Sequence, residues 1–443
     1  MAGNNIASSR LFNDSVQPAC RVGRIFSIAA VILIAPMLAP AQAAEPLSVQ
    51  QAVVIALQRN PDLLAARQEL ESARALVIKA HYLNQFNPQI EAGASQAHFQ
   101  FSPGGDEAQP AGSISLEVEA AGQRGKRIAA ADQNMAMARA DVADAQRLTK
   151  ARAEYAFYQA LYLRRRLELM QRIETLNLRL RDASMERFRS GETPKLEANL
   201  AAVRYDQSRR TTLLARRDYE NGLRALQRVL GLPPTGEIEI AGSLQEEAPE
   251  IDPERAFELA IAHRPDLRAR DYEIGRIAAD IALTRRLIIP NPVISGFAER
   301  TADAPGQFIR VLGGAVSLSI PLFDHKQAEL TALHGQQQRA SYQRAATQLT
   351  VEEQVRDALT AYAAAREVVQ LFESDAVARI QESFALIEGS YRSRKTGLIE
   401  LIVAENDLVA TDSSYLDSLW DYQVARIGIE AAVGVDFADL VKR

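Results

Sequence analysis

Hydrophobic residues recur with helical spacing along most of the chain, and the longest such stretch extends from Gly122 to Ser190. It contains no proline and, apart from Gly125, no further glycine, while strong helix formers dominate its composition. A continuous helix of this length would extend over about 100 Å at 1.5 Å per residue. One packed face is marked by apolar residues at spacings of three and four: Ile173, Leu176, Leu180 and Ala183.

Two stretches before this helix alternate polar with apolar residues, which predicts β-strands whose two faces meet different surroundings. We expect the first strand over 89–101 and the second over 111–121. The apolar residues that share one side are Ile90, Ala92 and Ala94 in the first strand and Ile114, Leu116 and Val118 in the second. Further helices are predicted over 46–83, interrupted at Asn60-Pro61, and over 195–230.

The second half of the chain repeats these signals in the same order. Asn60-Pro61-Asp62-Leu63 returns 204 residues later as Arg264-Pro265-Asp266-Leu267, and Asn87-Pro88 returns at the same displacement as Asn291-Pro292. Arg189-Ser190 recurs 203 residues later as Arg392-Ser393. We therefore predict a duplicated unit of helix, strand, strand, long helix and helix, in two repeats over 44–231 and 254–443. Residues 232–253, rich in proline, glycine and acidic residues, are the predicted linker.

The last helix of each half carries two ladders of residues seven positions apart, one of mostly larger residues and one of small residues. A sustained seven-residue repeat predicts left-handed supercoiling, and small residues let helix backbones approach closely. The second half has Leu401, Leu408, Tyr415, Tyr422 and Ile429 beside Ala404, Thr411, Ser418 and Ala425; the first half has Ala198, Tyr205, Thr212, Tyr219 and Leu226 beside Ala201, Ser208, Ala215 and Gly222.

Composition narrows the classes of function. The chain has 443 residues, of which 47% are hydrophobic and only 6% aromatic, and its formal charge of −5 argues against a nucleic-acid partner. The five histidines, including His263, His325 and His334, show no metal-ligand spacing, and we find no catalytic pair or cofactor fingerprint. We therefore expect neither an enzyme nor a cofactor or metal site.

The N-terminus has the pattern of a cleaved signal peptide over residues 1–43. Basic residues precede the apolar run 25–38, and Ala41-Gln42-Ala43 follows as a cleavage site. The alternative is a retained membrane anchor. Cleavage would remove Cys20, the only cysteine, so the exported chain would have no disulfide and no cysteine for lipid attachment. After Leu38 no apolar run is long enough for a transmembrane helix.

The four predicted strands have about the length that crosses a bilayer when tilted. Four strands cannot close a barrel, and an open edge cannot face lipid, so strands in a membrane would require an oligomer. The alternative from the pattern alone is a pair of soluble hairpins.

In this order and within a duplicated frame, four motifs make almost the whole exported chain resemble the TolC-like outer-membrane efflux channels of tripartite pumps. The run from Gly122 to Arg127 is most similar to the heavy-metal branch for cobalt, zinc and cadmium. The motifs are Asn60-Pro61-Asp62-Leu63, Asn87-Pro88, Gly122-Gln123-Arg124-Gly125-Lys126-Arg127 and Ile320-Pro321-Leu322-Phe323-Asp324.

The resemblance implies a mainly α fold with a small antiparallel β part. It implies a homotrimer with a twelve-stranded β-barrel in outer-membrane lipid, continued by a periplasmic helical barrel. In this helical barrel, pairs of shorter helices would stack end to end alongside the long helices. The pairs are 62–83 with 195–230 and 266–287 with 398–432. The channel would conduct passively and perform no chemistry. Its implied partners are a periplasmic adaptor (membrane fusion) protein and an inner-membrane pump of the resistance-nodulation-division type.

The resemblance also implies two periplasmic tips, where the adaptor docks. They are the turns containing Gly191, Thr193 and Pro194 and, in the second half, Lys395, Thr396 and Gly397. Glu197 and Glu400 are 203 residues apart, each just after a tip, and three copies would form an acidic ring at the periplasmic entrance. Relatives carry a second acidic residue one turn further, where this chain has Leu200 and Val403. The alternative is an ordinary first-turn glutamate that is stabilised by the helix dipole.

Two rival functions remain open from the sequence. A periplasmic coiled-coil adaptor or scaffold would show one hairpin in a β-rich module, and an exported enzyme would need a convergent polar site. Lys126 and Arg127, at the junction of strand and helix, are expected to be solvated, with contact to a membrane surface as the alternative.

Overall fold

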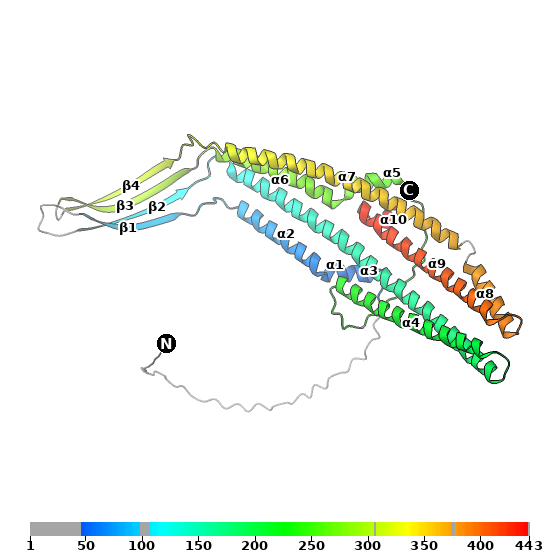
Figure 1. Ribbon diagram of the computed structural model, residues 1–443. Coiled ribbons are helices and arrows are strands. Elements are labelled where there is room, and N and C mark those ends of the chain that lie inside the picture. The colour runs from blue at the N-terminus through cyan, green and yellow to red at the C-terminus, as the bar shows by residue number, and fades with distance from the viewer. Residues whose placement is uncertain (1–45, 98–106, 305–306, 374–376, 442–443) are drawn as a thin grey trace, which may run out of the picture. The chain divides into compact units, whose positions relative to one another are not determined.

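The computed structural model of this chain describes residues 46–97, 107–304, 307–373 and 377–441, all within one unit, Glu45–Arg443. The predicted signal peptide over 1–43 lies outside these residues, as does the end of the first predicted strand. Its elements, drawn in Figure 1, are α1 (Val49–Arg59), α2 (Pro61–Ala80), β1 (Gln89–Ala97), β2 (Glu107–Glu117), α3 (Gln123–Arg189), α4 (Lys195–Val229), α5 (Pro253–His263), α6 (Pro265–Leu287), β3 (Pro292–Ala304), β4 (Gln307–Leu318), α7 (Gln327–Leu371), α8 (Val377–Arg392), α9 (Leu398–Val433) and α10 (Phe437–Val441).

The long helix predicted from the sequence is confirmed as α3, with 67 residues. It packs against α1, α2 and α4 of its own half and against α6 and α9 of the other half. In the second half the corresponding stretch is described as two helices, α7 and α8. The duplicated order of helix, strand, strand, long helical stretch and helix is therefore present in the fold (Figure 1).

The predicted end-to-end stacking of shorter helices is confirmed, and both halves use the same joint. Asn60 caps α2 by accepting from the Leu63 backbone N–H, and its Nδ2 donates to the Val229 carbonyl at the end of α4, 2.9 Å away. Arg264 occupies the equivalent position and donates from Nη1 to the Ala432 carbonyl near the end of α9, also at 2.9 Å. Each bond satisfies a carbonyl that would otherwise be left unpaired at a helix C-terminus.

Both predicted ladders face the packed side of their helices. None of their residues is exposed, and Tyr422, Ile429, Ala201 and Leu226 are almost completely buried. Gly222 lies so close to α3 that an added Cβ would be 2.7 Å from Leu163 Cδ1. The small residues therefore permit close helix packing, as the seven-residue spacing predicted.

The predicted linker is exposed over most of its length, but it is anchored to the core by three buried residues, Ile240, Leu244 and Ile251. Leu47 pairs with Ile240 in an isolated parallel bridge, and the Tyr362 and Tyr422 hydroxyls donate to the carbonyls of Pro249 and Glu247. Ile240 is fully buried within the large apolar cluster that joins the two halves. The segment between the repeats thus covers the middle of the helical bundle.

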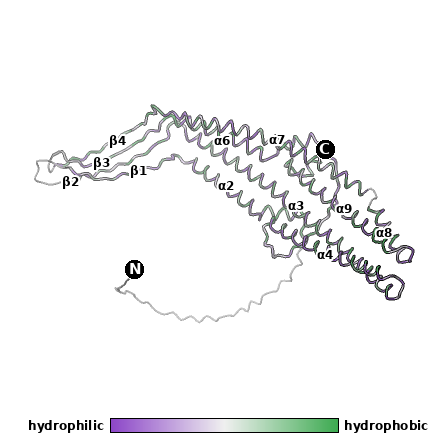
Figure 2. The backbone as a smooth tube through the Cα atoms, in the orientation of Figure 1, coloured by the Kyte–Doolittle hydropathy of each residue, from purple (hydrophilic) through white to green (hydrophobic). Residues whose placement is uncertain are grey.

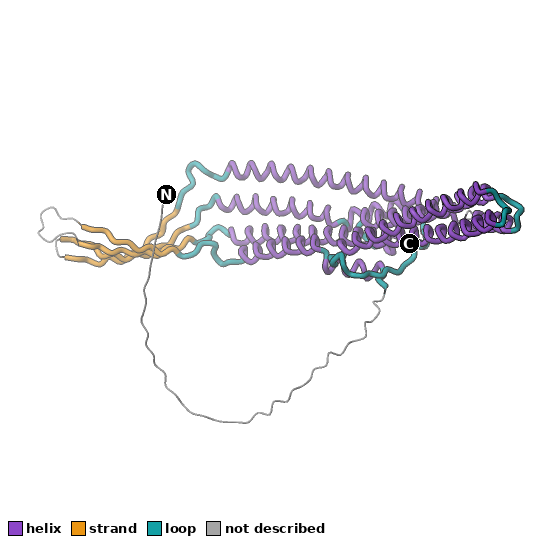
Figure 3. Tube along the Cα trace, turned by 60° about the horizontal axis from the view of Figure 1, so that its bottom comes forward, coloured by secondary structure: helices purple, strands orange, loops and turns teal. Residues whose placement is uncertain are grey.

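The strands form one antiparallel sheet in the order β1-β2-β3-β4. They lie at the end of the bundle opposite the α3–α4 and α8–α9 turns, as Figures 1 and 3 show. The predicted bounds of the second strand, 111–121, were wrong, because β2 extends from Glu107 to Glu117. Beyond Glu117 the β2–β3 ladder ends with the Val118 N–H donating to the Pro292 carbonyl, and the chain turns toward α3.

Candidate functional site

The two turns at the far end of the helices have the same backbone structure. The N–H groups of Gly191 and Glu192 donate to the carbonyls of Phe188 and Arg187, at 3.0 and 2.8 Å. In the second half the N–H groups of Arg394 and Lys395 donate to Tyr391 and Ser390 with the same two distances. This is the hydrogen-bond pattern of a Schellman motif, in which one residue adopts a left-handed conformation. The predicted tips are therefore equivalent turns.

The left-handed position is occupied by glycine in one turn and by arginine in the other. Gly191 has a φ of 76° at no steric cost, whereas Arg394 has a φ of 63°, which is uncommon for a residue with a side chain. The Arg394 guanidinium lies 3.0 Å from the carboxylate of Glu192 on the other turn. Arg394 thus accepts local backbone strain and forms an ion pair between the two tips.

The hydroxyl groups of both threonines in the predicted tips are buried. The Oγ1 atoms of Thr193 and Thr396 are buried, and neither has a hydrogen-bond partner among the described residues. Pro194, Lys395 and Gly397 are exposed beside them. The tips therefore combine an exposed surface with two enclosed polar atoms at equivalent positions.

Glu197 and Glu400 both lie in the first turn of their helices, as predicted. Glu197 is half-buried and Glu400 is exposed, and neither side chain forms a hydrogen bond or ion pair with a described residue. Glu400 Oε2 lies where it would be 2.8 Å from a Cβ added to Gly397, the residue before the helix. Its carboxylate therefore points back toward the positive end of the helix dipole, which is compatible with both interpretations made from the sequence.

At the other end of the protein, the strand register places most apolar residues on one face of the sheet. Ile90 pairs with Ile114, Leu116 with Ile294, and Ile294 with Val316. Residues directly opposite each other share a face, and residues two positions apart along a strand share it too. The apolar face also includes Ala92, Ala94, Gly112, Gly296, Ala298, Leu312, Gly314 and Leu318.

Charged side chains in the described strands are divided between the two faces. Glu91, Glu117 and Glu299 lie on the face opposite the apolar one, whereas Arg300 and Arg310 share the apolar face. The face of the glutamates also holds serines, Gln89 and four larger apolar residues, Val293, Phe297, Ile309 and Val311. The sequence pattern placed Glu91 on the side opposite Ile90, as the structure has it, whereas the faces of the other charged strand residues were not predicted. A signal was present in β1 and β2, where Glu91 and Glu117 occupy odd-numbered positions and Ile90 and Ile114 occupy even-numbered ones.

The junction of sheet and helices is held by a buried ion pair that the sequence did not predict. Arg127 is 8% exposed, pairs with Glu119, and donates from Nε and Nη2 to the carbonyls of Ala80 and Tyr82. The expectation of a solvated Arg127 was therefore wrong, because its guanidinium satisfies carbonyls at the end of α2. Lys126, its neighbour, is exposed.

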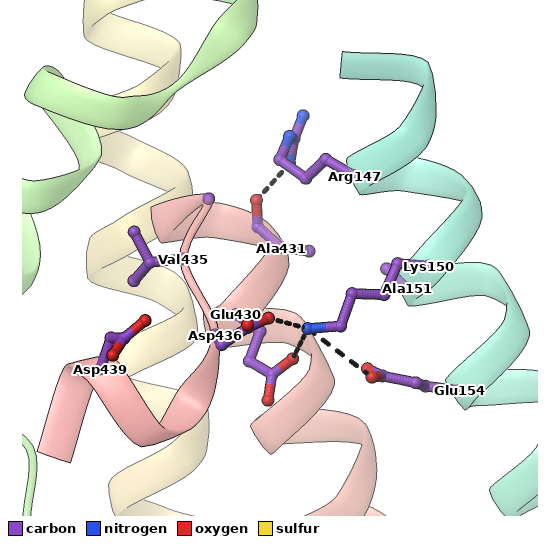
Figure 4. A pocket seen from close by; sticks show the side chains of 10 residues that line it. Arg147, Lys150, Ala151, Glu154, Glu430, Ala431, Val435, Asp436 and Asp439 are labelled. Carbon is purple, nitrogen blue, oxygen red and sulfur yellow. Dashed lines mark hydrogen bonds and ion pairs between the residues drawn. The ribbon is translucent and has the colours of Figure 1, made fainter. Parts of the chain in front are cut away.

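A hollow of about 300 Å³ lies where α3 meets the end of α9 (Figure 4). Lys150 reaches across it from α3 and pairs with Glu430, 3.1 Å away, with Asp436 and, at 3.8 Å, with Glu154 of its own helix. Arg426, one turn earlier on α9, pairs with Glu430 at 3.5 Å. Because Glu154, Glu430 and Asp436 already have cationic partners, these ion pairs join two helices.

Burial, together with the nearby Glu430 charge, raises the pKa of Glu154 to about 7, although Lys150 and Arg426 oppose the shift. The folded protein thus takes up a proton at higher pH than the unfolded chain, so stability falls as pH rises from about 4.5 to 7. We expect Glu154→Gln to raise the free energy of unfolding by about 2 kcal/mol at pH 8 and to change it little at pH 5. Thermal unfolding at the two pH values checks this, and an equal effect at both would contradict it.

The described residues hold no group of three or more histidine, cysteine or acidic side chains that could bind a metal ion. Among the described helices, none combines the length and apolar character needed to cross a membrane. Hydrophilic and hydrophobic residues are instead interspersed along these helices, as Figure 2 shows. The features that the fold presents are therefore two equivalent turns at one end and a two-faced sheet at the other.

Comparison with known proteins gives matches over nearly the whole described chain. The sequence model of the outer membrane efflux protein family matches residues 52–232 and 256–435. The cobalt-zinc-cadmium resistance protein CzcC of Cupriavidus metallidurans is 22% identical over 399 residues, which cover 89% of this chain and 92% of CzcC.

Solved structures share the same fold. The crystal structure of CusC matches with a TM-score of 0.74 and 16% identity, covering 87% of this chain and 92% of that one. The CmeC outer membrane channel of Campylobacter jejuni matches with a TM-score of 0.73 and 15% identity, covering 87% and 85% of the two chains.

Proposed function

The chain belongs to the outer membrane efflux protein family, and we propose that three copies of it form the exit duct of a tripartite pump for heavy-metal cations. It is an outer-membrane efflux channel, and its family is one of transport ducts. The trimer, the barrel, the partners and the metal substrate are the proposed parts.

The sheet supports assembly of several copies. Strands β1 and β4 are at its edges, so each leaves a row of backbone N–H and C=O groups without a strand partner in the described chain. In lipid such groups must be satisfied, and pairing β4 of one copy with β1 of the next does this around a closed ring. Three copies of four strands give twelve, within the range known for outer-membrane barrels.

The two faces of the sheet fit a barrel wall, and this division is the observation that carries the proposal. The face with Ile90, Ile114, Ile294, Val316 and Leu318 would meet lipid. The face with the three glutamates would line the pore, where water and substrate solvate them. A pore wall with carboxylates and without basic residues in the described strands suits the passage of cations.

The remaining proposals concern the opposite end. The 67-residue α3 has a length of about 100 Å and suits a tube across the periplasm. The equivalent tips, with exposed Pro194, Lys395 and Gly397, would dock a periplasmic adaptor, and the adaptor would link the duct to an inner-membrane pump of the resistance-nodulation-division type. The CzcC relative, named for cobalt-zinc-cadmium resistance, supports heavy-metal cations as substrate.

The first experiment is fractionation of cells that express the full chain, followed by mass analysis of cross-linked detergent extracts. We expect a trimer in outer membranes. Lys395→Cys, in the turn between α8 and α9, should cross-link to a co-expressed adaptor. Lys126→Cys, at the start of α3 beside the sheet, should not. A monomer in the soluble periplasmic fraction would contradict the proposed duct and favour the alternative of a periplasmic scaffold protein.

The acidic ring at the entrance has its own test. If three copies of Glu400 surround the opening, divalent cations added on the tip side will bind there and block current. We expect Glu400→Gln to weaken that block by roughly tenfold, because the neutral amide loses the electrostatic attraction. Glu352→Gln, a change on α7 away from the tips, is the matched control. Unchanged block in channels of both variants would exclude the ring.

Ion selectivity tests the assignment of the pore wall. We expect the double variant Glu91→Gln, Glu299→Gln to lower the ratio of cation to anion permeability by about threefold, because it removes two carboxylates per copy from the pore. Arg310→Gln, on the opposite face, should leave this ratio unchanged. Reversal potentials in a salt gradient measure it, and a shift with Arg310→Gln alone would reverse the two faces.

A further inference from the structure

Two arginines on the apolar face of the sheet have no acidic partner on that face among the described side chains. Arg300 of β3 and Arg310 of β4 are directly opposite each other in the strand register, and both side chains are exposed. The Arg300 guanidinium lies 3.6 Å from the centre of the Phe308 ring, and neither arginine forms an ion pair with a described residue. Like charges directly opposite on one face destabilise a sheet. An anion bound between the two guanidinium groups would reduce this repulsion.

The described strand side chains offer no such anion on that face. Glu299 is adjacent to Arg300 in sequence, but its side chain lies on the other face because successive residues of a strand alternate. The acidic side chains described in the strands, Glu91, Glu117 and Glu299, all lie on that other face. A neighbouring copy that pairs its β1 with β4 would add no acidic residue from the described part of β1 on the side of the arginines, where it presents Ile90, Ala92, Ala94 and Gln96.

The position of the pair along the strands indicates what surrounds it. From Leu318, near the helices, to Arg310 the apolar face extends over eight residues, about 26 Å along the strand. With the usual tilt this is about 20 Å across a membrane, close to the apolar band of outer-membrane barrels. The arginines thus lie at the edge of the apolar band that is farther from the helices. If the helices are periplasmic, that edge meets the headgroups of the outer leaflet.

We propose that Arg300 and Arg310 form a binding site for the phosphate groups of an outer-leaflet lipid. The inference rests on the proposed outer-membrane barrel. Guanidinium groups bind phosphate oxygens with paired hydrogen bonds, and an anion between two of them removes their mutual repulsion. The aromatic ring of Phe308 holds the Arg300 guanidinium beside the apolar band, where the acyl chains of the same lipid would lie.

Native mass spectrometry of the purified trimer with bisphosphorylated lipid A tests the proposal. We expect the double variant Arg300→Gln, Arg310→Gln to weaken lipid A binding by about tenfold or more, because charge-assisted hydrogen bonds are lost. The control Arg209→Gln, Arg210→Gln removes the same charge from exposed positions of α4 and should bind lipid A as the unchanged chain does. Phosphatidylcholine should bind all three proteins equally.

Three results would overturn the site. They are equal lipid A binding by the Arg300/Arg310 variant, equal binding of a dephosphorylated lipid A by the unchanged chain, and displacement of lipid A by equimolar inorganic phosphate. Failure of the proposed function is distinct from these, because the unchanged chain would then yield no outer-membrane trimer to which lipid could be added.

Discussion

Replacing Gly231 by alanine is expected to destabilise the protein by about 3 kcal/mol or more, well beyond the cost of the same change at Gly434. The two glycines follow α4 and α9 at equivalent places and have φ values of 68° and 83°. An added side chain is strained in this conformation by about 1–2 kcal/mol at either position. At Gly231, however, the new Cβ would also be 2.3 Å from the Arg59 carbonyl oxygen.

The contrast between the two positions isolates this backbone clash. At Gly434 the nearest atom to an added Cβ is Arg264 Cγ, 3.5 Å away, which is an ordinary contact. Both variants restrict the unfolded chain equally, so that contribution cancels. Thermal unfolding of Gly231→Ala and Gly434→Ala in the same detergent provides the measurement. Equal losses would mean that the joint between α1 and the end of α4 is looser than the structure indicates.

We expect Val316→Arg to prevent most of the protein from assembling in the outer membrane, whereas Ser317→Arg is tolerated. Val316 lies within the apolar face of β4, opposite Ile294, and is 72% exposed in the single chain. Arginine on a lipid-facing position costs about 2–4 kcal/mol at the bilayer midplane and less toward the interfaces. Val316 lies two residues inside the Leu318 end of the apolar face, so its cost is below the midplane value, but a trimer would incur it three times. Ser317 is its neighbour on the other face, opposite Val293, where water would solvate the charge.

The assembled trimer in outer-membrane fractions, compared with total expressed chain, measures the effect. A loss for Ser317→Arg with normal assembly of Val316→Arg would mean that the faces are reversed. Normal assembly of both would mean that the sheet does not contact lipid at all.

The helices were predictable because their signals are local. The run without breakers before Gly191 predicted α3, and the duplicated Pro61 and Pro265 marked the starts of α2 and α6. The seven-residue ladders identified the packed faces, since a fixed spacing on a helix is also a fixed direction. Alternation likewise revealed that the strands have two different faces, although the bounds of β2 were displaced by four residues.

Pairings between distant residues decide the rest, and no local pattern encodes them. From the sequence we expected Arg127 to be solvated, whereas in the fold it contacts Glu119 and the end of α2. Nothing in the sequence indicated that Arg394 would lie 3.0 Å from Glu192 of the other tip. The opposition of Arg300 and Arg310 depends on the β3–β4 register, and a slip of one residue would move one of them to the other face. Spacing along the chain specified which elements form, whereas register and packing specified which charges meet.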